Sequence, residues 1–205
     1  MTGTPDLALL ATEVAGVRAA HGRLHAAVAG RGDAELRRES RLPGWTVAHV
    51  LVHLARNADS IVRRLTAAAD GRVVDQYAGG AAGRAAEIEA GVQRSAATLL
   101  ADLQAADDAV DQALGATDAD VWGRDVQVGG GATGTAAALV LRRWREVEVH
   151  HVDLGLGYDW SQWPEELVTR WLPDLLGALP GRTDPWALVA WSTGRAPAPA
   201  LPPWG

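Results

Sequence analysis

Apolar residues in this chain recur alternately four and three positions apart, the spacing that lines one face of a helix. The clearest pattern lies in the segment that contains Val47, Leu51, Leu54, Ala58, Ile61 and Leu65. Such patterns, with their capping signals, predict four long helices over about residues 4–29, 46–70, 83–114 and 133–154. Helices of this length joined by loops are typical of an antiparallel four-helix bundle, so we expect a mainly all-α fold.

The pattern changes after Gly155. Residues 164–179 predict a shorter helix, and Asp184-Pro185 is a typical start for another, which should end near Gly194. Four prolines follow within residues 196–205 and favour an extended tail. We therefore expect residues 1–155 to form the bundle and residues 156–205 to form a short helical extension with a proline-rich tail. Before the fourth helix, residues 126–128 alternate in a way compatible with a short strand.

The fourth predicted helix has a polar seam where a core-facing stripe would be expected. Steps of four and three residues connect Leu139, Arg143, Glu146, His150 and Asp153. Burying such side chains without partners costs several kcal/mol, so a buried seam of this kind needs an ion, counter-charges or water. The simpler interpretation is an Arg143–Glu146 ion pair on a solvated helix face.

The second predicted helix offers His49 and His53 beside its apolar stripe. His53, Glu146 and His150 together supply two nitrogens and one oxygen from two helices, which leaves positions open for water or a substrate atom. Zinc is the expected ion, with iron, nickel or manganese as alternatives. The site requires the imidazole of His53 to lie within about 6 Å of the other two ligands, and otherwise His53 is a hydrogen-bonded core histidine.

The other polar residues favour structural roles. Helical geometry points Glu148 and His151 away from the Glu146 seam, so we expect them at the surface or behind the ligands. His21 and His25 lie four residues apart, but the sequence places no carboxylate beside them. Trp45 precedes the second helix and is a candidate to line a pocket, although packing of an aromatic side chain against the helix start is the simpler explanation.

Composition and charge exclude several classes of function. The net charge of -6 comes with no basic stripe, which argues against nucleic-acid binding. The chain has no cysteine, so any thiol chemistry must use sulfur from a small molecule. No run of about 18 apolar residues could span a bilayer, and no signal peptide is visible. We expect a cytoplasmic protein, either a monomer or a weak homodimer.

Three motifs resemble one known family. Residues 42–58 (LPGWTVAHVLVHLARNA) and 145–155 (REVEVHHVDLG) are similar to the second- and fourth-helix motifs of the mycothiol-dependent maleylpyruvate isomerase family, which belongs to the DinB-like metal-binding four-helix bundles. Residues 191–195 (WSTGR), followed by a proline-rich end with Trp204, resemble its C-terminal signature. The resemblance implies zinc ligands at His53, Glu146 and His150, and a functionally important arginine at Arg195.

The resemblance implies a zinc- and mycothiol-dependent isomerase acting on maleylpyruvate or a similar conjugated acid. In that reading Arg195 holds an enolate oxygen or a substrate carboxylate. Family isomerases have a larger C-terminal part than the fifty or so residues after Gly155, so the substrate stays open. One alternative is a mycothiol S-transferase that conjugates the thiol to an electrophile. Another is a metal-binding bundle without catalytic activity. Metal-assisted hydrolysis with Glu146 as base is weaker, because a ligand carboxylate is poorly free to move protons.

Overall fold

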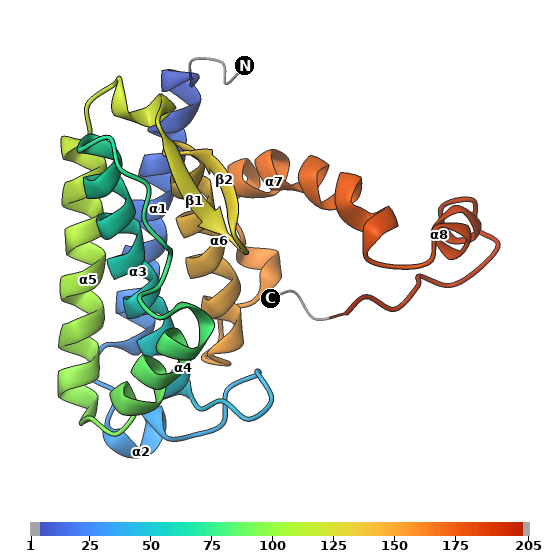
Figure 1. Ribbon diagram of the computed structural model, residues 1–205. Helices are drawn as coiled ribbons and strands as arrows, with labels where there is room; N and C mark the ends of the chain where they lie inside the picture. The colour runs from blue at the N-terminus through green and yellow to red at the C-terminus, as the bar shows by residue number, and fades with distance from the viewer. Residues whose placement is uncertain (1–4, 203–205) are drawn as a thin grey trace. The chain divides into compact units, whose positions relative to one another are not determined.

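Four long helices dominate the computed structural model, which describes residues 5–202. They are α1 (Leu7–Val28), α3 (Val47–Ala69), α5 (Ala96–Ala116) and α6 (Ala138–Asp153). Figure 1 shows them running side by side. The described chain forms two compact units, divided between Gln162 and Trp163. The mainly helical, DinB-like fold is confirmed, whereas an independent domain ending at residue 155 stays a prediction.

Local capping fixes the starts of the first two long helices. The Asp6 carboxylate accepts hydrogen bonds from the backbone N–H groups of Ala8 and Leu9. The Thr46 hydroxyl accepts one from the N–H of His49, so Thr46 is the N-cap of α3. Helix α3 ends at Ala69, close to the expected end near residue 70. Thr4, where the first helix was predicted to begin, lies outside the described residues. A four-residue helix, α2 (Asp33–Leu36), lies between α1 and α3.

The single third helix predicted over residues 83–114 is wrong, because the chain forms two helices there. These are α4 (Gly80–Gly91) and α5, and the latter begins after its N-cap Ser95. The Ser95 hydroxyl accepts from the N–H of Thr98, and Asp33 accepts from the N–H of Ala96 at 2.6 Å. Asp33 is distant in sequence from Ala96, so the spacing of apolar residues within 83–114 did not indicate the break between α4 and α5.

The fourth helix begins later than predicted, because a β-hairpin precedes it. Strands β1 (Asp125–Gly129) and β2 (Ala132–Thr135) pair antiparallel, which confirms the short strand near residues 126–128. Gly130 and Gly131 form the two-residue turn with φ of 58° and 79°. Positive φ at both positions suits a hairpin turn and is readily adopted by glycine. A 3-10 helix (Val121–Gly123) leads into the hairpin.

The helices pack so that α3 contacts both α5 and α6, and α1 likewise contacts α5 and α6. Residues 70–95, which include α4, carry the chain back along the bundle, so α3 and α5 run in the same direction (Figure 1). This pair departs from the antiparallel arrangement expected from the sequence. Helix α6 runs opposite to α3 and lies against it. The close approach of α1 and α6 depends on Gly16, where an added Cβ would lie 2.4 Å from the Trp144 ring.

The second unit is also helical in its described part. It contains α7 (Glu165–Ala178), a 3-10 helix (Leu179–Gly181) and α8 (Pro185–Ser192), which agree with the expected helices. Another 3-10 helix, Trp160–Gln162, ends the first unit. Residues 196–202 form no helix or strand, and Trp204 lies outside the described residues. Between residues 5 and 202, no helix combines the length and apolar character needed to cross a membrane.

Candidate metal centre

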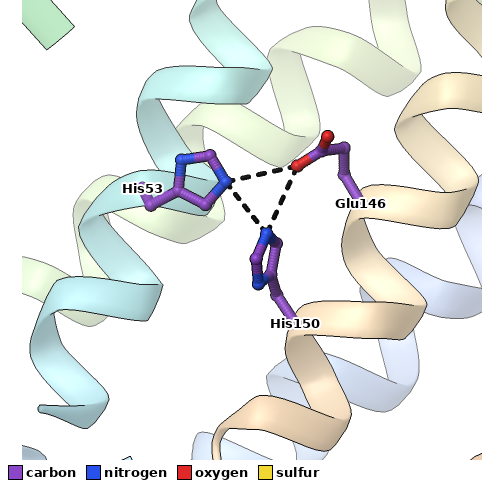
Figure 2. A group of neighbouring side chains, drawn as sticks. All are labelled: His53, Glu146 and His150. Carbon is purple, nitrogen blue, oxygen red and sulfur yellow. Dashed lines mark hydrogen bonds and ion pairs between the residues drawn. The ribbon is translucent and has the colours of Figure 1, made fainter. Parts of the chain in front are cut away.

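The three side chains predicted as metal ligands lie together at the contact between α3 and α6 (Figure 2). His53 comes from α3, while Glu146 and His150 lie one turn apart on α6. The Nε2 atom of His53 is 3.2 Å from a carboxylate oxygen of Glu146 and 3.1 Å from Nε2 of His150. The same oxygen is 3.5 Å from Nε2 of His150. The structure therefore meets the distance requirement set by the sequence.

The separations and the chemistry of these atoms fit a small divalent ion. Tetrahedral ligands at zinc bond lengths of 2.0–2.1 Å lie about 3.3 Å from one another. The three observed separations of 3.1, 3.2 and 3.5 Å bracket that value. Two imidazoles and one carboxylate are also a common donor set of catalytic zinc sites.

Asp153 orients one of the candidate ligands. Its carboxylate accepts a hydrogen bond from Nδ1 of His150 at 2.8 Å. A proton held on Nδ1 leaves Nε2, the atom that faces Glu146 and His53, to act as the metal ligand. Asp153 therefore selects the tautomer that a metal ligand needs. The sequence placed Asp153 on the polar seam but did not assign it this role. Its position three residues after His150, on the same helix face, could have indicated the contact.

The pKa values of all three candidate ligands are shifted by burial and by their contacts with one another. Burial lowers the pKa of His53 to about 4, against the opposing effect of its hydrogen bond to Glu146. Burial alone would lower the pKa of His150, but its hydrogen bonds to Asp153 and Glu146 raise that pKa to about 9. Burial would raise the pKa of Glu146, yet its contacts with the two histidines hold that pKa well below its usual range.

Two residues that the sequence did not assign to the site contact His53. A guanidinium nitrogen of Arg84, from α4, lies 2.9 Å from Nδ1 of His53. The Trp45 ring meets the His53 ring edge-on, with centroids 5.8 Å apart. Trp45 thus lines the site in addition to packing at the helix start. His49 does not join the triad: its Nδ1 is hydrogen-bonded to Thr46 and its Nε2 lies 3.7 Å from Glu89.

The expectation that Glu148 and His151 lie at the surface is wrong. Both are buried, at 0% and 2% exposure. Glu148 accepts hydrogen bonds from Arg23, from Trp144 and, at 2.5 Å, from the Tyr158 hydroxyl. The His151 ring stacks on Tyr158 with centroids 4.0 Å apart. Helical geometry correctly predicted that both residues point away from the Glu146 seam. They are nevertheless buried, because that side of α6 is also covered by other parts of the chain.

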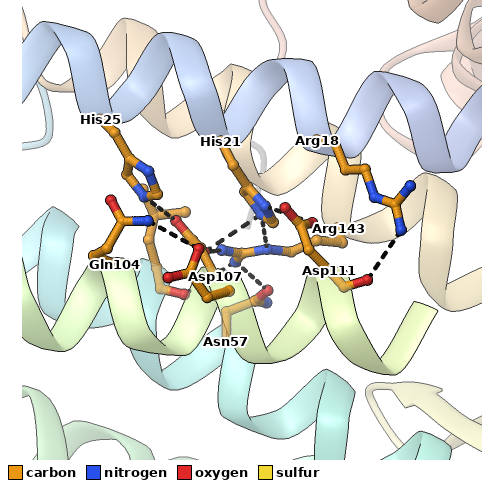
Figure 3. Close-up of polar contacts among 10 residues, drawn as sticks. Arg18, His21, His25, Asn57, Gln104, Asp107, Asp111 and Arg143 are labelled. Atoms are coloured by element: carbon orange, nitrogen blue, oxygen red, sulfur yellow. Dashed lines mark hydrogen bonds and ion pairs between the residues drawn. The ribbon is translucent and has the colours of Figure 1, made fainter. Parts of the chain in front are cut away.

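Arg143 belongs to a buried network, which rules out the ion pair with Glu146 on a solvated face (Figure 3). Its guanidinium donates to the Leu54 carbonyl at 3.0 Å and to Oδ1 of Asn57 at 2.9 Å, both on α3. It also pairs with Asp107 of α5 and donates to Nε2 of His21 at 3.2 Å. Arg143 therefore ties α6 to three other helices, one turn from Glu146.

The two histidines of α1 do have carboxylate partners, which corrects the sequence-based expectation. His25 lies 2.8 Å from Asp107, and His21 lies 3.1 Å from Asp111 (Figure 3). Burial would raise the pKa of Asp107, but the Arg143 charge and the nearby histidines hold that pKa below its usual value. These residues form a structural cluster. The sequence did not predict it, because the carboxylates lie on α5 and reach the histidines only through the packing of α5 against α1.

Arg195 follows α8 in the second unit. Its guanidinium contacts the carbonyl oxygen of Thr193. Its predicted role in catalysis stays a prediction.

The fold and the three converging side chains define a DinB-like helical bundle with a candidate metal centre. The profile of the family described as the mycothiol maleylpyruvate isomerase N-terminal domain matches residues 17–155. The match covers more than half of the chain, so the chain belongs to this family. No curated protein matches the chain.

Two solved structures resemble the chain. One is a mycothiol-dependent maleylpyruvate isomerase, 26% identical with a TM-score of 0.75. The other is a His-to-Ala variant of such an isomerase, 26% identical with a TM-score of 0.74. Each comparison covers 78% of this chain and 66% of the solved chain. The chain thus spans slightly less than two thirds of the isomerases that it resembles.

Proposed function

We propose that this protein is a zinc- and mycothiol-dependent isomerase of maleylpyruvate or a similar conjugated keto acid. His53, Glu146 and His150 would hold the ion. The convergence of these three side chains from two helices is the observation that carries the proposal. The chain's membership of the mycothiol maleylpyruvate isomerase family supports the choice of thiol and substrate class.

Each residue contributes to binding or orientation. Glu146 supplies a negatively charged oxygen, and Asp153 keeps the proton of His150 on Nδ1, away from the ligand atoms. With the ion and mycothiol bound, the metal charge favours thiolate over thiol, and reversible addition of that thiolate lets the conjugated double bond rotate. Arg195 would hold the enolate oxygen or a substrate carboxylate through its paired N–H donors.

A mycothiol S-transferase is the second candidate, because the match covers only 66% of the isomerase chain and leaves the identity of the substrate open. The two activities differ in their products. An isomerase regenerates free thiol, whereas a transferase consumes one thiol for each substrate molecule. A non-catalytic bundle would bind zinc without turnover of any electrophile. The expected cytoplasmic location and the monomer or weak homodimer stay predictions.

The test combines elemental analysis with a thiol-dependence assay on maleylpyruvate. The wild-type chain should hold one zinc ion and isomerise the substrate only with mycothiol. His53→Ala and His150→Ala should each lose both zinc and turnover. His49→Ala is the matched control, because His49 lies one turn before His53 and outside the triad. Full zinc retention in both ligand variants would refute the metal assignment, and turnover without thiol would refute the mechanism.

A further inference from the structure

We propose that Arg84 is an anion-binding residue at the edge of the metal centre and holds a carboxylate of the substrate. This inference rests on the proposed function, since it names the substrate chemistry that the same site recognises. Arg84 lies on α4, outside the three motifs that carry the family resemblance. Its place beside His53 follows from the return of residues 70–95 along the bundle.

Two aromatic rings flank the Arg84 guanidinium beside the metal centre. Its central carbon lies 5.9 Å from the Trp45 ring centroid and 5.7 Å from the Tyr77 ring centroid. Both distances are within the range of cation–π attraction. One of its nitrogens lies 2.9 Å from Nδ1 of His53. The side chain is half-buried, so the positive charge is held in place and still reachable by a ligand.

Arg84 has no acidic partner among residues 5–202, unlike the arginines near it. Arg56 and Arg94 both form ion pairs with Asp102, at 2.9 and 3.0 Å. No carboxylate in the described chain lies within ion-pair distance of Arg84. A guanidinium has five N–H donors in a planar fork that matches a carboxylate with two parallel hydrogen bonds. Most of this donor capacity is therefore available to an incoming anion.

The contact with His53 points to the same use. Arginine can only donate, so Nδ1 of His53 accepts the hydrogen bond from Arg84. A neutral histidine that binds a metal through Nε2 carries its proton on Nδ1, where it would face another donor. Metal binding and the Arg84–His53 hydrogen bond are therefore mutually exclusive. With the centre loaded, we expect the Arg84 donors to turn to another acceptor at this edge, and a substrate carboxylate supplies one.

The test measures binding of maleate, an unreactive dicarboxylate probe in the absence of thiol, to the zinc-loaded protein by calorimetry. Arg84→Gln should weaken maleate binding by tenfold or more, because a hydrogen bond to a charged group contributes about 1.5–3 kcal/mol and about 1.4 kcal/mol is tenfold. Arg84→Lys, which keeps the charge but loses the fork, should weaken it less. Arg94→Gln is the matched control, because it removes a nearby arginine that already has a partner.

Zinc content, measured on every variant, separates a binding role from a structural one. We expect Arg84→Gln to retain zinc and to raise KM for maleylpyruvate more than it lowers kcat. Maleate affinity that is unchanged in both Arg84 variants would overturn the inference, as would a wild-type protein that does not bind maleate. If Arg84→Gln loses zinc or unfolds, the Lys variant decides by the same comparison. Arg84-dependent maleate binding without thiol-dependent turnover would refute the proposed isomerase but leave this inference standing.

Discussion

Removing the charge of Asp107 should destabilise the protein severely, because it leaves the Arg143 guanidinium buried without its counter-ion. Arg143 is 0% exposed, and its other hydrogen bonds go to the Leu54 carbonyl, the Asn57 amide oxygen and the His21 ring, none of which is a carboxylate. Removing one partner of a buried ion pair costs about 3–5 kcal/mol. Asp107→Asn, which preserves shape, should lower the free energy of unfolding by that amount. For a chain of this length the melting temperature should fall by roughly 6–20 °C.

The measurement is urea unfolding followed by circular dichroism at pH 7. Asp108→Asn is the matched control, since it makes the same chemical change at the next residue, on the exposed side of α5. Its effect should be within about 0.5 kcal/mol. A double variant, Asp107→Leu with Arg143→Met, should lose clearly less stability than the sum of the two single variants, because it leaves neither charge unpaired. Equal stability of Asp107→Asn and Asp108→Asn would refute the reasoning.

The same pair predicts a pH dependence. The pKa of Asp107 is lower in the folded state than in the unfolded chain, where it is about 3.9. Between these two values the unfolded state binds more protons, so lowering the pH destabilises the fold. The stabilisation by Asp107 is complete above about pH 4 and is lost as the pH falls through the folded pKa. The stability difference between wild type and Asp107→Asn should therefore shrink as the pH falls below about 4. A difference that grows on acidification would contradict the assigned pKa direction.

Three further predictions concern single side chains. Asp153→Ala should weaken zinc binding by roughly tenfold to a hundredfold in chelator competition, since it frees the His150 ring to adopt the wrong tautomer; unchanged affinity would remove its orienting role. His151→Leu should stabilise the fold by about 1 kcal/mol in urea unfolding, because neither buried ring nitrogen has a hydrogen-bond partner among residues 5–202. Removing these two unpaired polar atoms gains more than the lost stacking on Tyr158 costs. A loss of stability would indicate a bound water or ligand there. Arg195→Ala should keep its zinc and lower kcat/KM by about a hundredfold or more, and unchanged kinetics would exclude the proposed role.

The buried network and the metal centre use the same two helices in different ways. Arg143 bonds to the Leu54 carbonyl and to Asn57 on α3, while Glu146 and His150 approach His53 on that helix. The Arg143 contacts fix how far α6 is translated and rotated against α3. They therefore set how far His53 lies from the other two candidate ligands, because a shift of either helix would change both the His53–Glu146 and the His53–His150 distance.

Sequence periodicity alone determined the features that depend on a single helix. The rise and turn of an α-helix place Glu146 and His150 on one face wherever that helix packs, so their pairing was readable from a spacing of four. The same reasoning turned Glu148 and His151 away from the seam. The choice of His53 over His49 as the third ligand preceded the motif resemblance, which then implied the same residue.

Only the tertiary structure decided what comes together from distant parts of the chain. Asp33 accepts a hydrogen bond from the Ala96 N–H where α5 begins, and Asp107 pairs with the buried Arg143, each contributed by another helix. Arg84 reaches His53 because the connection between α3 and α5 returns along the bundle. Helical period fixes the direction of a side chain about its own axis, but the rotation and offset of one helix against another come from packing between residues far apart in sequence. Burial, partner charges and the access of an anion to the metal centre all depend on that packing.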